Sequence, residues 1–191
     1  MTTKLQIINN ALTFLGNQPV ATLNLQNTVV QSMSSIYDLI LPDIMASHPW
    51  HFALKWVELV QDPTPPEIDT WTYSYHLPVD YIQSWNFYPL GNFTIVHDKL
   101  IWTNMSPPWK WGYIGTVSEG DFPGYFALLM SYALTAESAM LVTENPQIAQ
   151  YWEGKASQQR VIAQNRDFTA QPNPSIATNR MWSSHWGPRS L

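Results

Sequence analysis

The residues best placed to share a metal ion are His48 and His51, which are three positions apart. Metal sites in proteins generally need a third or fourth ligand, and Pro49 breaks the helical spacing that would aim both rings at one point. No acid or third histidine nearby in the sequence completes a site. We therefore expect the two histidines to flank a helix end and to satisfy backbone groups there, with no bound metal.

Carboxylates could act in pairs as the acid and base of a glycosidase, and Asp62, Glu67, Asp69 and Asp80 lie close together in the sequence. Each lies beside a proline or in a predicted loop, where acids ordinarily form turns. The chain has no cysteine, no nucleophile elbow, no phosphate-binding loop and no His-Glu-x-x-His helix. The sequence therefore predicts no enzyme activity and no cofactor.

Tryptophans are the one dense feature of the middle of the chain. Flat rings on a sheet could stack on sugar rings, or they could fill a small core and make subunit contacts. We favour packing, because ordinary core residues are scarce in this region. The interface candidates are Trp71, Trp85, Trp102, Trp109 and Trp111.

Two helices are predicted before residue 50. Apolar residues recur at three- and four-residue steps over residues 5–15, and Gly16 is placed to end that helix in the left-handed conformation. A second helical pattern covers residues 29–45 and contains Pro42, which predicts a kink.

Two more helices are predicted after residue 118. Asp121 is the expected N-cap of the first, with Pro123 in its first turn. Asn145 and Pro146 begin the second by the same device, and it runs to about Phe168 with a polar, glutamine-rich face. Its apolar pattern consists of Ile148, Trp152, Ala156, Val161 and Ile162.

Between these helical pairs the pattern favours strands. They are predicted at residues 52–60, 71–76, 81–87, 93–97, 100–103 and 111–117, with a tight hairpin at residues 97–99. The predicted fold class is α+β and mainly helical, with a four-helix bundle-like body, an inserted small antiparallel β-domain and an extended C-terminal tail. The expected division is an N-terminal helical pair (1–49), the β-domain (50–118), a C-terminal helical pair (119–168) and a C-terminal arm (169–191).

The composition departs from that of a self-contained globule. Charged residues make up 12% of the 191 residues and aromatic residues 14%, against about 25% charged residues in a typical globular protein. Interfaces are enriched in aromatics and depleted in Lys and Glu, so the composition predicts an obligate oligomer.

Charge is unevenly distributed along the chain. Residues 1–154 contain four lysines, no arginine and thirteen acids, whereas residues 155–191 contain five basic residues and one acid. An acidic body argues against tight nucleic-acid binding, and the basic end is interpreted as an arm that touches a partner protein. A disordered terminus is the alternative. The expected anchors are Arg180, Met181, Trp182, His185, Trp186 and Arg189.

No apolar run approaches the roughly 18 residues of a membrane span, and the N-terminus is too polar for a signal peptide. We therefore expect no membrane contact and synthesis in a cytoplasm.

Three stretches together resemble the head-to-tail adaptor (connector) family of tailed bacteriophages, which includes the tail tubular protein A of short-tailed phages. They are Ala11-Leu12-x-x-Leu15-Gly16-x-x-Pro19-Val20-x-x-Leu23, His48-Pro49-Trp50-His51-Phe52-Ala53 and Trp71-x-Tyr73-x-Tyr75-x-Leu77-Pro78-x-Asp80-Tyr81. The resemblance covers about residues 5–165.

The resemblance implies a non-enzymatic virion protein of the neck: a ring of twelve subunits that joins the portal to the tail nozzle and continues the DNA ejection channel. It also implies that the C-terminal arm reaches the portal or a neighbouring subunit. A mostly acidic channel wall would let DNA pass without specific binding. The alternative, from another class, is a carbohydrate-binding module of a receptor-recognition tail protein.

Overall fold

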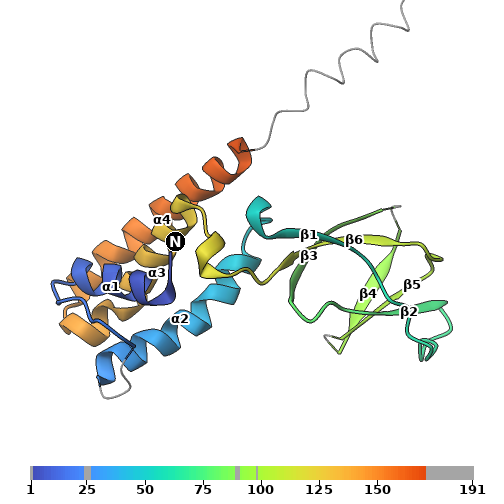
Figure 1. The fold of residues 1–191 in the computed structure, drawn as a ribbon, viewed down its shortest axis with the longest axis horizontal. Helices are drawn as coiled ribbons and strands as arrows, with labels where there is room; N and C mark the ends of the chain where they lie inside the picture. Colours follow the sequence, from blue (N-terminus) through green and yellow to red (C-terminus); the bar gives the residue numbers. More distant parts are fainter. Residues whose placement is uncertain (1, 24–26, 89–90, 98, 171–191) are drawn as a thin grey trace, which may run out of the picture.

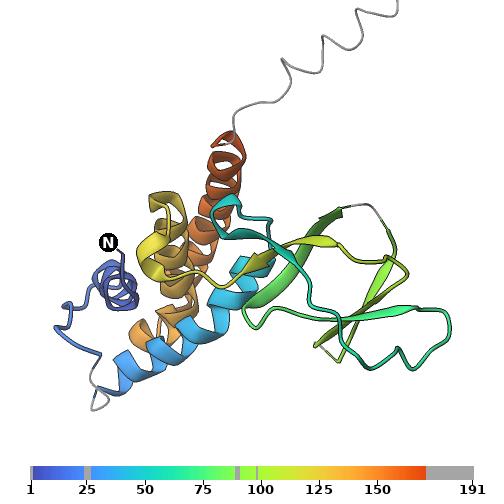
Figure 2. The same cartoon turned by 45° about the vertical axis from the view of Figure 1, so that its right-hand side comes forward.

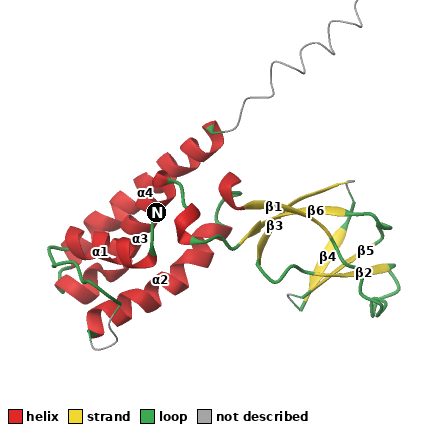
Figure 3. Cartoon of the chain, viewed as in Figure 1, coloured by secondary structure: helices red, strands yellow, loops and turns green. Residues whose placement is uncertain are grey.

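The computed structural model describes residues 2–23, 27–88, 91–97 and 99–170. Within them the chain forms helices, then strands, then helices again, and more residues lie in helices than in strands. The α+β class is therefore confirmed. In Figures 1 and 3 the helices lie together on the left and the strands on the right, with the end of α2 and the turn before α3 between them.

The first two helices are α1 (Lys4–Phe14) and α2 (Thr28–Ala46), and both predictions are confirmed. The Asn27 side chain caps α2 by accepting hydrogen bonds from the backbone N–H groups of residues 29 and 30. Gly16 follows α1 with φ of +81°, the left-handed conformation predicted for it. Pro42 lies inside α2, which continues past it as one helix.

The last two helices are α3 (Gly124–Thr143) and α4 (Pro146–Thr169). α4 begins as predicted, because Asn145 accepts a hydrogen bond from Gln147 N at 2.9 Å. The predicted N-cap of α3 is wrong. Asp121 lies in a short 3-10 helix, η2 (Glu119–Asp121), and Pro123 occupies the N-cap position without a side-chain hydrogen bond.

α3 is the central helix, and α1, α2 and α4 each pack against it. An 18-residue window of α3 is apolar enough to cross a membrane, with mean hydropathy 1.4, but 56% of that window is buried inside the protein. Small polar residues allow close packing here. Asn10 of α1 donates a hydrogen bond to Ser131 Oγ of α3 at 3.2 Å, and the Ser131 hydroxyl donates in turn to the Ala127 carbonyl of α3 at 2.9 Å. These properties describe the core helix of a helical body.

The strands form two small antiparallel sheets, in the orders β1-β6-β3 and β2-β5-β4. Their bounds are β1 Leu54–Glu58, β2 Tyr73–His76, β3 Tyr81–Tyr88, β4 Phe93–Val96, β5 Leu100–Thr103 and β6 Lys110–Gly115. The predicted antiparallel region is thus confirmed. The predicted strand at 52–60 is shorter, because its first residues form the 3-10 helix η1 (His51–Ala53).

The two parts of the chain meet at a shared apolar core. Buried Ile114 of β6 belongs to the same cluster as the helical core, and Leu54 and Ile82 of the neighbouring strands pack against that cluster. A second cluster, centred on Trp109 and Trp111, lies between the strands. Figure 2 shows the sheets beside the C-terminal end of α2. The helical body and the β-domain are therefore joined by packing as well as by their connections.

Candidate functional site

The predicted anchors of the C-terminal arm lie outside the described residues. These are Arg180, Met181, Trp182, His185, Trp186 and Arg189. α4 ends at Thr169, so the first residue of the predicted arm (169–191) belongs to this helix.

The tryptophans proposed as interface residues of the β-domain divide into two groups. Trp102, Trp109 and Trp111 are buried within their own chain at 6%, 1% and 0% exposure, so for them the interface assignment is wrong and core packing is the correct interpretation. Trp71 is half-buried, and Trp85 is 40% exposed. Trp71 and Trp109 lie outside the strands, and β5 and β6, which carry Trp102 and Trp111, are buried along most of their length.

Trp85 forms an exposed aromatic corner with Trp56, a residue absent from the predicted interface. Their ring centroids are 5.8 Å apart with the planes at 83°, and Trp56 is 49% exposed. A Cβ on Gly112, opposite Trp56 in the sheet, would lie 3.2 Å from three atoms of the Trp56 ring. The indole therefore lies flat over the glycine, with its other face turned outward.

Several exposed apolar side chains of the helical body lie on α4. Apolar side chains there are strongly exposed: Tyr151 57%, Val161 58%, Ile162 45% and Phe168 71%. At 3.6 residues per turn these four fall within about a third of the circumference, opposite the buried side of the helix at Ala149, Ala163 and Asp167. Val161 and Ile162, which belong to the apolar pattern of this helix in the sequence, therefore lie on its exposed side.

We call this surface the outer face of α4. Its members are Gln147, Gln150, Tyr151, Gly154, Gln158, Val161, Ile162, Asn165 and Phe168. None of them is charged; the charged residues of α4 lie at other positions around the helix. A helix of 24 residues is about 36 Å long, so the outer face is an extended strip. Its members carry no charge, but Lys155 Nζ reaches its edge, 5.6 Å from the centre of the Tyr151 ring. Absence of charge and exposure of aromatics distinguish interface cores from ordinary surface.

A buried carboxylate fastens the last turns of α4 to the start of the β-domain. Asp167 is fully buried, and its Oδ1 accepts a hydrogen bond from the Tyr125 hydroxyl at 2.7 Å. Its Oδ2 lies 2.8 Å from His51 Nδ1 and 3.3 Å from His48 Nε2, and the His51 backbone N–H donates to both oxygens. Burial, and then the hydrogen bond to Asp167, raises the pKa of Tyr125.

We call Asp167 and the groups that contact it, Tyr125, His51 and His48, the Asp167 node. It gives the two histidines a role that sequence reasoning missed. His51 Nδ1 also lies 3.2 Å from the backbone oxygen of Asp167, but the main partner of both rings is the carboxylate rather than backbone. The acid is 116 residues away from His51, so local spacing carries no signal for it. Among the described residues, no group of three His, Asp or Glu side chains is arranged to hold a metal ion.

A second polar node lies at the edge of the β-domain nearest the helices. Asp80 Oδ2 accepts from Lys55 Nζ at 2.6 Å, and its Oδ1 accepts from the Tyr113 hydroxyl at 2.9 Å. Burial would raise the pKa of the Asp80 carboxyl, but these hydrogen bonds and the Lys55 charge outweigh it and hold the pKa below its usual range. Burial, with the hydrogen bond to Asp80, raises the pKa of Tyr113 to about 12.

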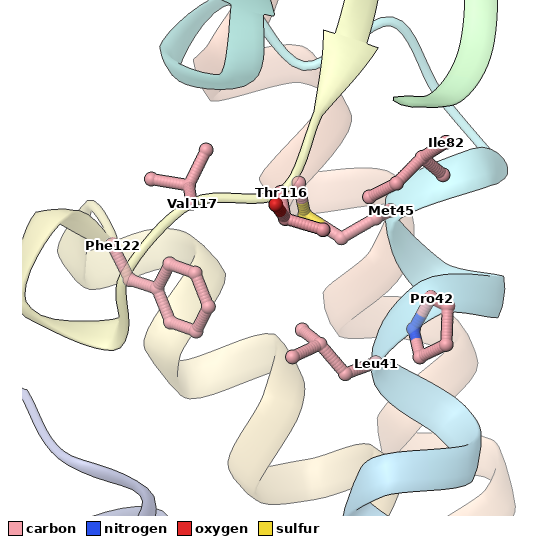
Figure 4. A pocket seen from close by; sticks show the side chains of 7 residues that line it. All are labelled: Leu41, Pro42, Met45, Ile82, Thr116, Val117 and Phe122. Carbon is pink, nitrogen blue, oxygen red and sulfur yellow. The ribbon is translucent and has the colours of Figure 1, made fainter. Parts of the chain in front are cut away.

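An apolar cavity of about 230 Å³ opens where the helical body meets the β-domain. Figure 4 shows side chains from α2, β3 and the segment between β6 and α3 converging on it. They are Leu41, Pro42, Met45, Ile82, Thr116, Val117 and Phe122. We call this the junction cavity; its lining offers almost no polar groups, so it suits an apolar occupant.

Comparison with known proteins does not place the chain in a family, because no family model matches it and no curated protein matches it. Function is therefore argued from the surfaces themselves.

Proposed function

We propose that this protein is a structural virion protein: a head-to-tail adaptor that assembles into a ring, of twelve subunits, between the portal and the tail nozzle. The ring continues the DNA ejection channel in the neck of the virion, after synthesis of the subunit in the host cytoplasm. It is not an enzyme, and DNA passes through it without specific binding.

The observation that carries the proposal is the outer face of α4. Tyr151, Val161, Ile162 and Phe168 are exposed on one side of the helix, and apolar side chains gathered on one exposed face favour an interaction site. In a cyclic ring each subunit contacts its neighbour head to tail through two different surfaces, and in the proposal the outer face of α4 is one of these two surfaces.

The arrangement of the chain agrees with this role. In the proposal the four helices act as a bundle-like frame, and the β-domain projects from one end of it towards the nozzle. The exposed pair Trp56 and Trp85 supplies a contact surface on that domain. A net charge of −5 on every subunit makes the assembled ring acidic, and in the proposal acids on the channel wall let DNA slide by repelling its phosphates.

The experiment is a comparison of native masses for the full chain and two matched variants, alone and with the portal protein of the same virus. Val161→Asp places a charge in the outer face of α4, whereas Val79→Asp makes the same change at an exposed valine of the β-domain. We expect the ring to form with the wild type and Val79→Asp and to be lost with Val161→Asp. Equal assembly of all three proteins would contradict the use of this face.

The second candidate function is carbohydrate binding by a receptor-recognition tail module. The aromatic corner favours it, because Trp56 turns one ring face outward and Trp85 stands at 83° to it. Glycan-array binding by the purified chain, lost in Trp56→Ala and kept in the Val79→Asp control, would support this function in place of the adaptor.

A further inference from the structure

The junction cavity has no role in the ring contacts proposed above, and the chain itself contains a suitable occupant. We propose that the junction cavity binds the chain's own C-terminal segment, residues 171–191, with the indole of Trp182 inside it. This inference does not depend on the adaptor function.

The first support is the chemistry and size of the cavity. Its walls are apolar apart from Thr116 at the rim, and its volume is about 230 Å³. An apolar cavity of ~150 Å³ is enough to bind benzene, so a larger one accommodates an aromatic side chain. Aromatic residues bury the most apolar surface per side chain, which makes an indole the favoured filling.

The second support is reach. The end of α4 lies beside the end of α2, because Asp167 Oδ2 is 3.3 Å from His48 Nε2, and Met45 of the cavity wall is three residues before His48. Trp182 follows Ala170, the last described residue, by twelve positions. Twelve extended residues span up to ~40 Å. The segment therefore starts close to the cavity and is long enough to enter it.

The third support is complementary charge. Asp43 follows the lining residue Pro42, and η2, with Glu119 and Asp121, directly precedes the lining residue Phe122. Lys55, which donates to the carbonyl of the lining residue Thr116 at 2.9 Å, is already paired with Asp80 at 2.6 Å.

Residues 171–191 contain Arg180 and Arg189 and no acid. In an extended peptide, side chains two positions apart point to the same side, so in the proposal Arg180 lies on the same side of the segment as Trp182, turned towards the protein that carries these acids. This pairing distinguishes Trp182 from Trp186, which has no arginine two positions before it.

The consequence concerns the state of the free subunit. If the chain is an adaptor, Trp182 has to leave the junction cavity before the arm binds the portal or a neighbouring subunit. The cavity would then keep the arm on its own subunit until a stronger site competes for it.

The test uses the absence of native cysteine. In the full chain, Thr116→Cys at the cavity rim is combined with Ser183→Cys next to Trp182, and oxidised glutathione is added to form a disulfide. The control pairs Ser183→Cys with Ser35→Cys, an exposed position on α2. We expect rapid linkage within one chain for the first pair only. Trp182→Ala should slow that linkage by about tenfold or more, and Trp186→Ala should leave it unchanged.

Three results would overturn the proposal: equal linkage rates for the two cysteine pairs, no effect of Trp182→Ala, or a product that joins two copies. The last would show that the cavity receives the arm of another subunit. None of these results bears on whether the ring forms, so failure here and failure of the adaptor function are distinguishable.

Discussion

Replacing Asp167 by Asn should destabilise the fold more than is usual for a substitution between side chains of the same size. The carboxylate of Asp167 is fully buried and accepts from the Tyr125 hydroxyl, the His51 backbone N–H and the histidine rings at 2.7 to 3.3 Å. Asparagine keeps one acceptor oxygen and turns an NH₂ group towards the remaining donors. At least two donors lose a charged acceptor, at about 1–3 kcal/mol each. We expect a loss of about 2–4 kcal/mol in the free energy of unfolding.

Urea unfolding followed by tryptophan fluorescence measures this loss as a lower midpoint at unchanged slope. Tyr125→Phe is the matched control, because it removes a single donor and leaves the carboxylate with its other partners; its expected cost is about 1 kcal/mol. The cost of the double variant should differ from the sum of the two single variants, since both change the same hydrogen-bond network. A loss below about 1 kcal/mol for Asp167→Asn would refute the view that this node fastens α4 to the β-domain.

Three further predictions concern single side chains. Asp80→Asn should lower the free energy of unfolding more at pH 7 than below about pH 4. Folding lowers the pKa of the Asp80 carboxyl, so its charged form stabilises the folded chain above the ordinary pKa, and this stabilisation is lost as the pH falls. Urea unfolding measured across this pH range checks the prediction. Gly115→Ala should cost about 1–2 kcal/mol in the same assay, since its Cβ would lie 2.8 Å from Asp80 Oδ2 and 2.9 Å from Lys55 Cδ. Gly154→Ala should raise the free energy of unfolding of the unassembled chain by about 0.5–1 kcal/mol, and with it the urea midpoint, because nothing lies within 4 Å of the added Cβ. An unchanged or lower midpoint for that variant would show that Gly154 has a neighbour in the chain.

Local signals in the sequence were sufficient for most of the helices. The Asn145-Pro146 pair fixes the start of α4, and Gly16 adopts the left-handed conformation after α1, because capping and positive φ depend on a few adjacent residues. The prediction of the N-cap of α3 was wrong, because residue type alone does not fix where a helix begins. Asp121 has the right residue type, but the chain forms a 3-10 turn there, and α3 begins only after Pro123.

The surfaces were harder to predict than the elements. Val161 and Ile162 belong to the apolar pattern of α4, yet both are exposed, because the buried side of the helix carries Ala149, Gln159, Ala163 and Asp167 instead. The Asp167 node depends on a contact between residues 116 positions apart, which no local spacing encodes. The exposure of Trp56 depends on the sheet register that places it over Gly112.

The central claim is that the chain works as a ring on a portal. The most direct measurement is the native mass of the full chain, alone and mixed with the portal protein of the same virus. We predict an assembly of twelve subunits, either already present in the free protein or formed when the portal is added. A chain that stays monomeric and unbound in both conditions would contradict the account.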